Sequence, residues 1–304
     1  MNIKDEVSKV ESNRTEKLAE LSAIVRNSCN VSGGLKITIE NNSVARRIFK
    51  LFKDVYGINL NITVRRRYGF SNNLIYILGT NKNYSKVVND LSIIDSEGNY
   101  LDVPHEYLIS DNDDMRAYLR GLFMTCGSVN DPKTSRYHLE FVVNTSGYAN
   151  FISDVLNGYN LNSKVIKRDK NYMVYIKEAE KISDFLRLIK AYNGVMYFED
   201  IRIYRDHKNM TNRLNNCEQA NMDKIFITAS NQIRDIEKLK KYDLLDVIDN
   251  KLKEVVEYRV KYPESSLSEL AEVMSNELGY SITKSGLNHR FRKIKDMVSK
   301  IDNK

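Results

Sequence analysis

Two stretches of the chain decide its fold: Leu21-Ser-Ala-Ile-Val-Arg-Asn-Ser-Cys29 and Leu119-Arg-Gly-Leu-Phe-Met-Thr-Cys-Gly127. We interpret them as two copies of one helical motif, because Leu119 follows Leu21 by 98 residues and the segments after each stretch repeat in kind. Self-similarity at a fixed spacing indicates an internal duplication. The sequence therefore predicts two related halves that meet through these two helices.

The segments that follow the two motifs have the same order. After the first motif, strand and helix periodicities predict a strand, a helix and two further strands, at Leu35–Glu40, Val44–Phe52, Ile58–Val64 and Leu74–Leu78. After the second motif, the corresponding segments are Tyr137–Val143, Tyr148–Leu156, Ser163–Lys167 and Tyr172–Lys177. Each half is thus predicted to be an α-β-β-α-β-type unit. Two such units would form one α+β domain with an antiparallel saddle.

Short polar segments mark the helix starts and the connection between the halves. Asp95–Pro104 contains Gly and Pro and is predicted to connect the repeats. Asp111–Asp114 precedes the second motif; its acids resemble metal ligands, but Asp or Asn before an apolar helical run is typical of an N-cap. Asn41–Ser43 and Thr145–Gly147 are predicted to cap the inner helices in the same way.

The second motif, within Ala117–Pro132, resembles the motif of LAGLIDADG homing endonucleases. In that family two such helices pack along a pseudo-two-fold axis, and an acidic residue before the last Gly binds the divalent metal at the scissile phosphate. Here that position is Cys126 in the second copy and Ser28 in the first. The resemblance therefore implies the fold of this family without its metal-binding acids.

The glycines of the motif bear on how closely the two helices approach. Gly121 and Gly127 are present in the second copy, and both are expected to allow close approach between the motif helices. Cys29 stands where the first repeat of this type more usually has Gly. Its larger side chain is expected to loosen the packing there.

Composition limits the protein class. The chain has 304 residues, enough for two domains with cores of their own, and its formal net charge is +7. It contains no run of about 18 apolar residues and begins with a polar segment, so we expect a cytoplasmic protein without a membrane partner. Cys29, Cys126 and Cys217 are expected to be free thiols, and neither they nor the four histidines show metal-site spacing. No cofactor or small-molecule substrate is predicted.

The C-terminal part has the pattern of a helix-turn-helix. Leu267–Met274 carries an apolar stripe, a break follows at Leu278–Ser281, and the next helix is expected to begin after an N-cap at Thr283. Its buried stripe would consist of Leu287, Phe291, Ile294 and Val298. The residues predicted to contact DNA are Thr283, Lys284, Ser285, Asn288, His289, Arg290, Arg292, Lys293 and Lys295.

Charge distinguishes this second helix from the residues before it. Residues 231–283 contain 8 Lys and Arg against 11 Asp and Glu, whereas residues 284–304 contain 7 against 2. A basic surface that binds no partner is the alternative for any such charge cluster. The helix-turn-helix spacing favours double-stranded DNA as the partner.

Two further runs resemble the bacterial WhiA family. Arg213-Leu-Asn-Asn-Cys-Glu-Gln-Ala-Asn-Met-Asp-Lys224 matches the family's Asn-Cys-Glu-x-Ala-Asn-x-Asp-Lys run, and Lys284–Ile294 matches its C-terminal helix. With this resemblance we divide the chain into a degenerate LAGLIDADG-like domain at 1–204 (repeats about 15–95 and 111–204), a linker at 205–230 and a helix-turn-helix domain at 231–304. From Arg205 the linker is polar, and part of it is expected to be helical.

The WhiA resemblance implies a non-catalytic, nucleoid-associated DNA-binding regulator. It would act in transcription of sporulation genes, in cell division and chromosome segregation, or in both, and another regulatory protein is a further possible partner. A nuclease would need carboxylates at positions 28 and 126 to hold Mg²⁺, where the chain has Ser28 and Cys126. The alternative function is a protein-interaction scaffold at the nucleoid with weak DNA tethering.

Basic residues on the predicted saddle strands leave two interpretations open. Arg65-Arg-Arg67 and the cluster from Lys164 to Lys170 have the charge to bind phosphates. Lys and Arg also commonly protect exposed sheet edges from pairing. The sequence favours neither interpretation over the other.

Overall fold

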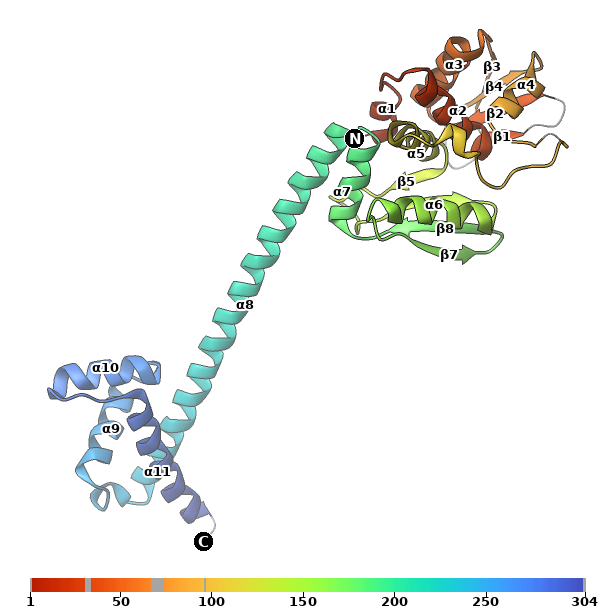
Figure 1. Ribbon diagram of the computed structural model, residues 1–304. Helices are drawn as coiled ribbons and strands as arrows, with labels where there is room; N and C mark the ends of the chain where they lie inside the picture. The colour runs from red at the N-terminus through yellow and green to blue at the C-terminus, as the bar shows by residue number, and fades with distance from the viewer. Residues whose placement is uncertain (1, 31–33, 67–73, 96, 303–304) are drawn as a thin grey trace. The chain divides into compact units, whose positions relative to one another are not determined.

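The computed structural model describes residues 2–30, 34–66, 74–95 and 97–302, and is shown in Figure 1. It divides into two compact units, Met1–Arg205 and Asp206–Lys304, which we describe separately. Within the described ranges, no helix is both long enough and apolar enough to span a bilayer.

The first unit begins with one copy of the duplicated fold. Helix α2 continues almost directly into a short strand, and a longer strand, a helix and a hairpin of two strands follow. The elements are α1 Ile3–Val7, α2 Arg14–Ser28, β1 Cys29–Asn30, β2 Leu35–Ile39, α3 Asn42–Tyr56, β3 Asn61–Arg66, β4 Leu74–Thr80 and α4 Tyr84–Asp90.

The second copy repeats this order. After the 3₁₀ turn η1 Glu106–Leu108, its elements are α5 Asn112–Cys126, β5 Gly127–Val129, β6 Leu139–Val143, α6 Ser146–Gly158, β7 Lys164–Arg168, β8 Asn171–Ile176 and α7 Ala179–Leu188. Both motif stretches are therefore the C-terminal halves of equivalent helices, α2 and α5. The predicted duplication is confirmed.

Each copy folds into one antiparallel sheet of four strands. The strand orders are β1-β2-β4-β3 and β5-β6-β8-β7, so equivalent strands occupy equivalent places. In β2, Leu35, Ile37 and Ile39 are buried while the residues between them are exposed, as the predicted alternation requires. The inner helices α3 and α6 cover one face of their sheets (Figure 1). We call the other face of each sheet, on which Thr38 and Val142 lie, the open face; the outer strands β3 and β7 are exposed on both faces.

The structure adds elements that the sequence did not predict. The strands β1 and β5 contain two and three residues, too few to produce an alternation that a sequence pattern can reveal. Helices α4 and α7 close the repeats, so each half has one more strand and one more helix than the predicted unit. Strand β3 begins at Asn61 and not at Ile58.

The predicted N-caps are present in the first unit. The Asn41 side chain accepts a hydrogen bond from the Val44 N–H at 2.9 Å, and Thr145 accepts one from the Tyr148 N–H at 3.3 Å. Asp111 accepts one from the Asp113 N–H at 2.9 Å. The acids before α5 thus start a helix, since a capping side chain satisfies an N–H group that has no partner within the helix.

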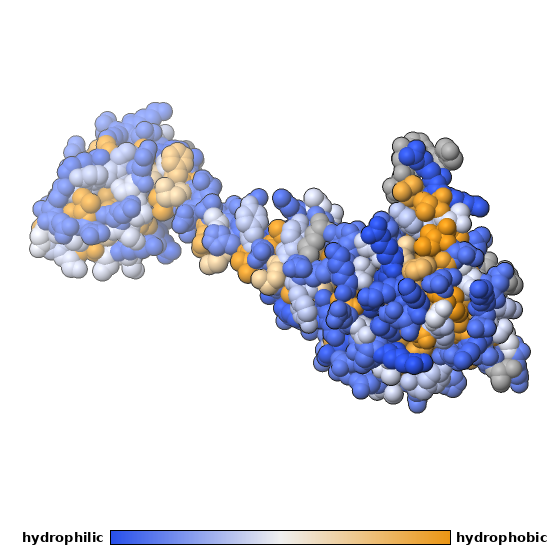
Figure 2. All heavy atoms as spheres, turned by 90° about the horizontal axis from the view of Figure 1, so that it is seen from above, coloured by the Kyte–Doolittle hydropathy of each residue, from blue (hydrophilic) through white to orange (hydrophobic). Residues whose placement is uncertain are grey.

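Helix α8, Tyr192–Lys241, contains the whole of the predicted linker. Neither Gly nor Pro occurs between Val195 and Lys241, so nothing interrupts backbone hydrogen bonding along this polar segment. Several apolar side chains on it are exposed, among them Met210, Leu214, Met222 and Phe226, and Figure 2 shows apolar atoms at the surface of this helix.

The second unit is entirely helical. The 3₁₀ turn η2 Leu244–Asp246 and the helices α9 Asn250–Lys261, α10 Leu267–Leu278 and α11 Lys284–Asp302 follow α8. Its core includes Ile236 and Leu239 of α8, together with Val255, Leu270, Met274 and the stripe of α11. The last turns of α8 therefore belong to the folded core of this unit.

Candidate nucleic-acid interface

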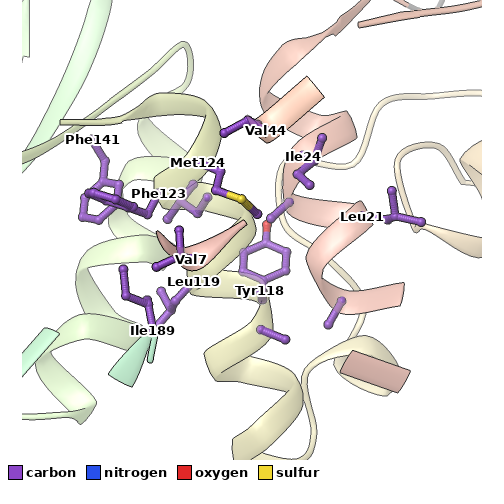
Figure 3. Close-up of a cluster of buried hydrophobic side chains, with 14 of the residues drawn as sticks. Val7, Leu21, Ile24, Val44, Tyr118, Leu119, Phe123, Met124, Phe141 and Ile189 are labelled. Carbon is purple, nitrogen blue, oxygen red and sulfur yellow. The ribbon is translucent and has the colours of Figure 1, made fainter. Parts of the chain in front are cut away.

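The motif helices α2 and α5 pack directly on each other in the centre of the first unit (Figure 3). A Cβ added at Gly121 would lie 2.4 Å from the backbone oxygen of Glu20 and 3.1 Å from the Ala23 Cβ. Only Gly permits this approach, so the prediction for Gly121 is confirmed. The prediction for Gly127 is wrong: a Cβ there would meet Phe123 of its own helix, because α5 has ended and the chain turns into β5.

A network of buried charges joins the same two helices. The Glu20 side chain has no exposed surface; it accepts hydrogen bonds from Arg47 Nε at 2.8 Å and from Arg120 Nη2 at 3.1 Å. Both arginines also donate to the Ser12 hydroxyl. Sequence analysis missed this network, although Arg120 lies within the largely apolar run of the second motif and Glu20 directly precedes the first motif.

The positions of the lost acids carry neutral side chains. The Ser28 hydroxyl and the Cys126 thiol donate to the backbone oxygens one turn earlier, those of Ile24 and Leu122. Burial raises the pKa of the Cys126 thiol to about 12, although the positive charge of Lys4 opposes this shift. A neutral thiol and a hydroxyl are poor ligands for Mg²⁺.

Lys4 places a cation beside the former metal position of α5. Burial lowers the pKa of Lys4, while Cys126 and Glu40 are near enough to favour its charged form. A positive side chain in this place would repel a divalent metal. Among the described residues, no group of three or more His, Cys, Asp or Glu is arranged to hold a metal ion.

The sheet register shows which basic residues of the saddle lie on the open face of each sheet. Arg65 pairs with Ile75 and shares the open face with Thr38, whereas Arg66 points to the opposite face. Lys164 and Arg168 lie on the open face of the second sheet, and Lys167 does not. Arg67 lies outside the described residues.

The open face of the second sheet is chemically mixed. Beside Lys164 and Arg168 it carries Ile166, Met173 and Tyr175, and Ile166 is 48% exposed. The strands β3 and β7, which carry the basic residues, are the outermost strands of their sheets. Charge on an outermost strand protects a free edge as well as binding phosphate, so both interpretations stay predictions.

The C-terminal unit forms the predicted helix-turn-helix from α10 and α11. Gly279 ends α10 with φ +73°, a left-handed conformation that Gly adopts without strain. The Thr283 hydroxyl accepts a hydrogen bond from the Gly286 N–H at 3.1 Å, which confirms the predicted N-cap. Leu287, Phe291, Ile294 and Val298 are buried against the rest of the unit. The predicted stripe is therefore correct.

The stripe leaves the opposite side of α11 open to solvent. Eight of the nine residues predicted to contact DNA are exposed: Thr283, Lys284, Ser285, Asn288, His289, Arg292, Lys293 and Lys295. Arg290 is half-buried, and its charge and that of Glu254 act on Tyr280. It thus lies toward the helix-turn-helix body, apart from the other eight.

Helix α8 contributes to the same surface, which sequence analysis did not predict. Asn288, Arg292 and Lys295 line one side of a groove of 330 Å³, and Thr228, Asn231 and Arg234 of α8 line the other. Ser285, His289 and Lys293 are exposed outside this groove. The sequence of the linker gave no indication that α8 lies beside α11, because its polar residues show no pattern that reveals a packing partner.

Comparison with known proteins identifies the family. Three family models match in succession: the WhiA N-terminal LAGLIDADG-like domain at residues 14–94, the WhiA LAGLIDADG-like domain at 115–208 and the WhiA C-terminal HTH domain at 211–298. A protein of Enterococcus faecalis named "Probable cell division protein WhiA" is 40% identical over 308 residues, covering 100% of this chain and 98% of the relative. The chain belongs to the WhiA family.

Other WhiA proteins agree over the full length. The one from Bacillus cytotoxicus is 39% identical over 98% of this chain and 95% of its own length, and carries the same name. The crystal structure of full-length DUF199/WhiA from Thermatoga maritima matches with a TM-score of 0.59 and 22% identity, covering 98% of this chain and 96% of that one. At this identity the structural match speaks for the fold. The predicted LAGLIDADG-type saddle followed by a helix-turn-helix is confirmed.

Proposed function

We propose that this WhiA protein is a non-catalytic regulator that binds double-stranded DNA with the exposed side of α11. One observation carries the proposal: a buried apolar stripe fixes α11 on the helix-turn-helix, and the opposite side presents amide, imidazole and basic groups to solvent. Such groups reach base edges and phosphates when a helix enters the major groove. Its action would lie at the nucleoid, in transcription of sporulation genes, in cell division and chromosome segregation, or in both, and the naming of its relatives as cell division proteins supports the division role.

Two substitutions on α11 test this proposal. A preferred duplex is first selected from a random library with the full chain. Asn288→Ala should then cost about 1–3 kcal/mol on the preferred duplex and much less on random DNA, because a base contact carries sequence information. Lys293→Ala should weaken both about equally and lower the slope of log K against log salt by about one, as expected for one phosphate contact.

The saddle supplies the matched control. Arg65 is an exposed cation on the open face of the first sheet; if it only protects the sheet edge, Arg65→Ala should leave both affinities and the salt slope unchanged. If Arg65→Ala weakens binding while Asn288→Ala keeps the preference between sequences, the recognition surface lies on the saddle and the proposal is wrong.

We also propose that the saddle has no nuclease activity. The neutral side chains of Ser28 and Cys126, with Lys4 beside the latter, support this. Plasmid DNA incubated with the protein and Mg²⁺ or Mn²⁺ should stay intact, and Cys126→Asp should not create cleavage, because a second carboxylate is missing at Ser28. Nicking that disappears when the motif helices are altered would contradict the proposal.

A second candidate function is a protein-interaction scaffold with weak DNA tethering. The exposed apolar residues on the open face of the second sheet favour it, since Val142 is 39% and Ile166 is 48% exposed. Binding of duplex DNA by residues 1–205 alone, with a clear salt dependence, would argue against this function for the saddle.

A further inference from the structure

The family signature in the linker helix borders a cavity that meets the proposed recognition surface at Lys284. Asn221 and Lys224, from the Arg213–Lys224 run, line this cavity of 450 Å³ together with Arg259 of α9, Ser266 and Ser268 at the start of α10, and Lys284 at the start of α11. Four helices of one compact unit thus meet here. The cavity also shares Thr228 with the groove between α8 and α11.

The cavity has a consistent charge. Lys224, Arg259 and Lys284 come from three different helices, and none of the lining residues, all of which are described, carries a carboxylate. Within the described chain, neither Lys224 nor Lys284 has an ion-pair partner. Three cations around one space favour an anionic ligand, although the Glu269 carboxylate lies next to the lining residue Ser266.

The start of α10 adds hydrogen-bond donors. This helix has 12 residues, and its N-cap Ser266 accepts from the Glu269 N–H, while the Glu269 carboxylate is turned back to the Ser266 N–H at 2.7 Å. The first N–H groups of a helix have no partner within it, and the positive end of the helix dipole lies there. The capping box satisfies the N–H groups of Ser266 and Glu269, so the N–H groups of Leu267 and Ser268 are the ones left to favour an anion.

Arg259 adds a buried guanidinium to the lining of the cavity. Its side chain is 1% exposed, and Nη1 donates to the backbone oxygens of Tyr262 at 3.2 Å and Ser265 at 2.6 Å. Its Nε is buried without a hydrogen-bond partner, and the guanidinium lies 5.5 Å from the centre of the Phe291 ring. Burial lowers the pKa of Arg259. A buried cation without a counter-charge is costly, and a bound anion would offset that cost.

We propose that this cavity binds a phosphate group of the DNA backbone, gripped by Lys224 from the linker helix and Lys284 from α11 around the start of α10. The inference rests on the proposed DNA binding and extends it to α8. The cavity and the groove beside Asn288 share Thr228 and lie on neighbouring parts of α8, so a strand lying along the recognition helix would pass near the cavity. On this proposal, Asn221 and Lys224 of the Arg213–Lys224 run take part in binding DNA.

The test compares two lysines of the same helix in the full chain. Lys224→Gln should weaken binding to the preferred and the random duplex alike, about fivefold near 0.15 M salt, and lower the salt slope by about one. Lys208→Gln, also exposed on α8 but 16 residues before the cavity, should bind as wild type does. Lys284→Gln should reproduce the Lys224→Gln result. Circular dichroism of the three variants should match wild type, since all three lysines are exposed.

Two further measurements separate the possible failures. If wild type binds duplex DNA and Lys224→Gln binds it equally well with the same salt slope, the cavity is not a backbone site. If, in addition, 10 mM inorganic phosphate raises the thermal unfolding temperature of wild type but not of Lys224→Gln, the cavity takes a free anion, and the assignment to DNA is wrong. Failure of wild type to bind any duplex would overturn the proposed function itself.

Discussion

Helices α5 and α11 were both singled out by their sequences, but the structure uses them in opposite ways. In α5, the eight consecutive residues Ala117–Met124 are all buried, so this helix has no free side in its motif. In α11, the buried residues from Lys284 to Lys300 all belong to the stripe from Leu287 to Val298, and the polar side is exposed. The motif helix thus serves packing, whereas the helix with the basic surface can meet a partner.

The largest expected effect lies in the buried charges between the motif helices. Glu20→Ala removes the carboxylate that Arg47 and Arg120 share, and leaves two arginines buried without a full counter-charge. Breaking a buried pair from one side costs about 3–5 kcal/mol of unfolding free energy. Calorimetry of the full chain should show the saddle transition at a lower temperature, and the helix-turn-helix unchanged.

Arg187→Ala is the matched control for Glu20→Ala. Arg187 forms exposed ion pairs with Asp184 at 2.6 Å and Glu199 at 3.6 Å, and such pairs contribute about 0–1 kcal/mol. If the two substitutions cost the same, the buried network does not hold α2 to α5, and the contrast with α11 loses its basis.

The next effect concerns the closest approach of the motif helices. Gly121→Leu should cost about 1–3 kcal/mol, because the new side chain overlaps the Glu20 backbone of α2. Gly158→Ala in α6 is the control, since nothing lies within 4 Å of a Cβ there, and it should leave stability unchanged or slightly raised. An unmoved saddle transition in Gly121→Leu would mean that the interface is assigned incorrectly.

The difference between the two helices also explains what the sequence could predict. The α11 stripe and the alternation in β2 and β6 follow from periodicity, which is a local property, and both were correct. The duplication, inferred from the repeat of such patterns along the chain, was also correct, whereas β3 and β7 are exposed on both faces and show no alternation in burial. The shared carboxylate of Glu20 was not foreseen, because Arg47 and Arg120 are 27 and 100 residues away in the chain. The cavity beside Lys224 was missed for the same reason. Its residues come from four helices, and no pattern within one helix shows which neighbours it meets.

A smaller effect is expected at the start of α11. Thr283→Ala removes the hydroxyl that caps the Gly286 N–H, and loss of such a cap costs about 1 kcal/mol. The helix-turn-helix transition should move and the saddle transition should not, the reverse of Glu20→Ala. Thr283→Ser keeps the hydroxyl and should keep the stability of wild type. A shift in the saddle transition would show that the two units unfold together.

The smallest effect distinguishes a partly buried thiol of α5 from an exposed one on α8. Burial raises the pKa of Cys126 from its usual value near 9 to about 12, so between these values the unfolded chain loses the thiol proton and the folded chain keeps it. The unfolded state then binds fewer protons, and the free energy of unfolding must fall as the pH rises above about 9. From pH 8 to pH 10, wild type should lose about 1 kcal/mol more than Cys126→Ala. Cys217 is exposed, so Cys217→Ala should follow wild type across this range. Denaturant titrations at both pH values measure the difference; parallel losses in wild type and Cys126→Ala would show that the end of α5 is as open to solvent as the surface of α8.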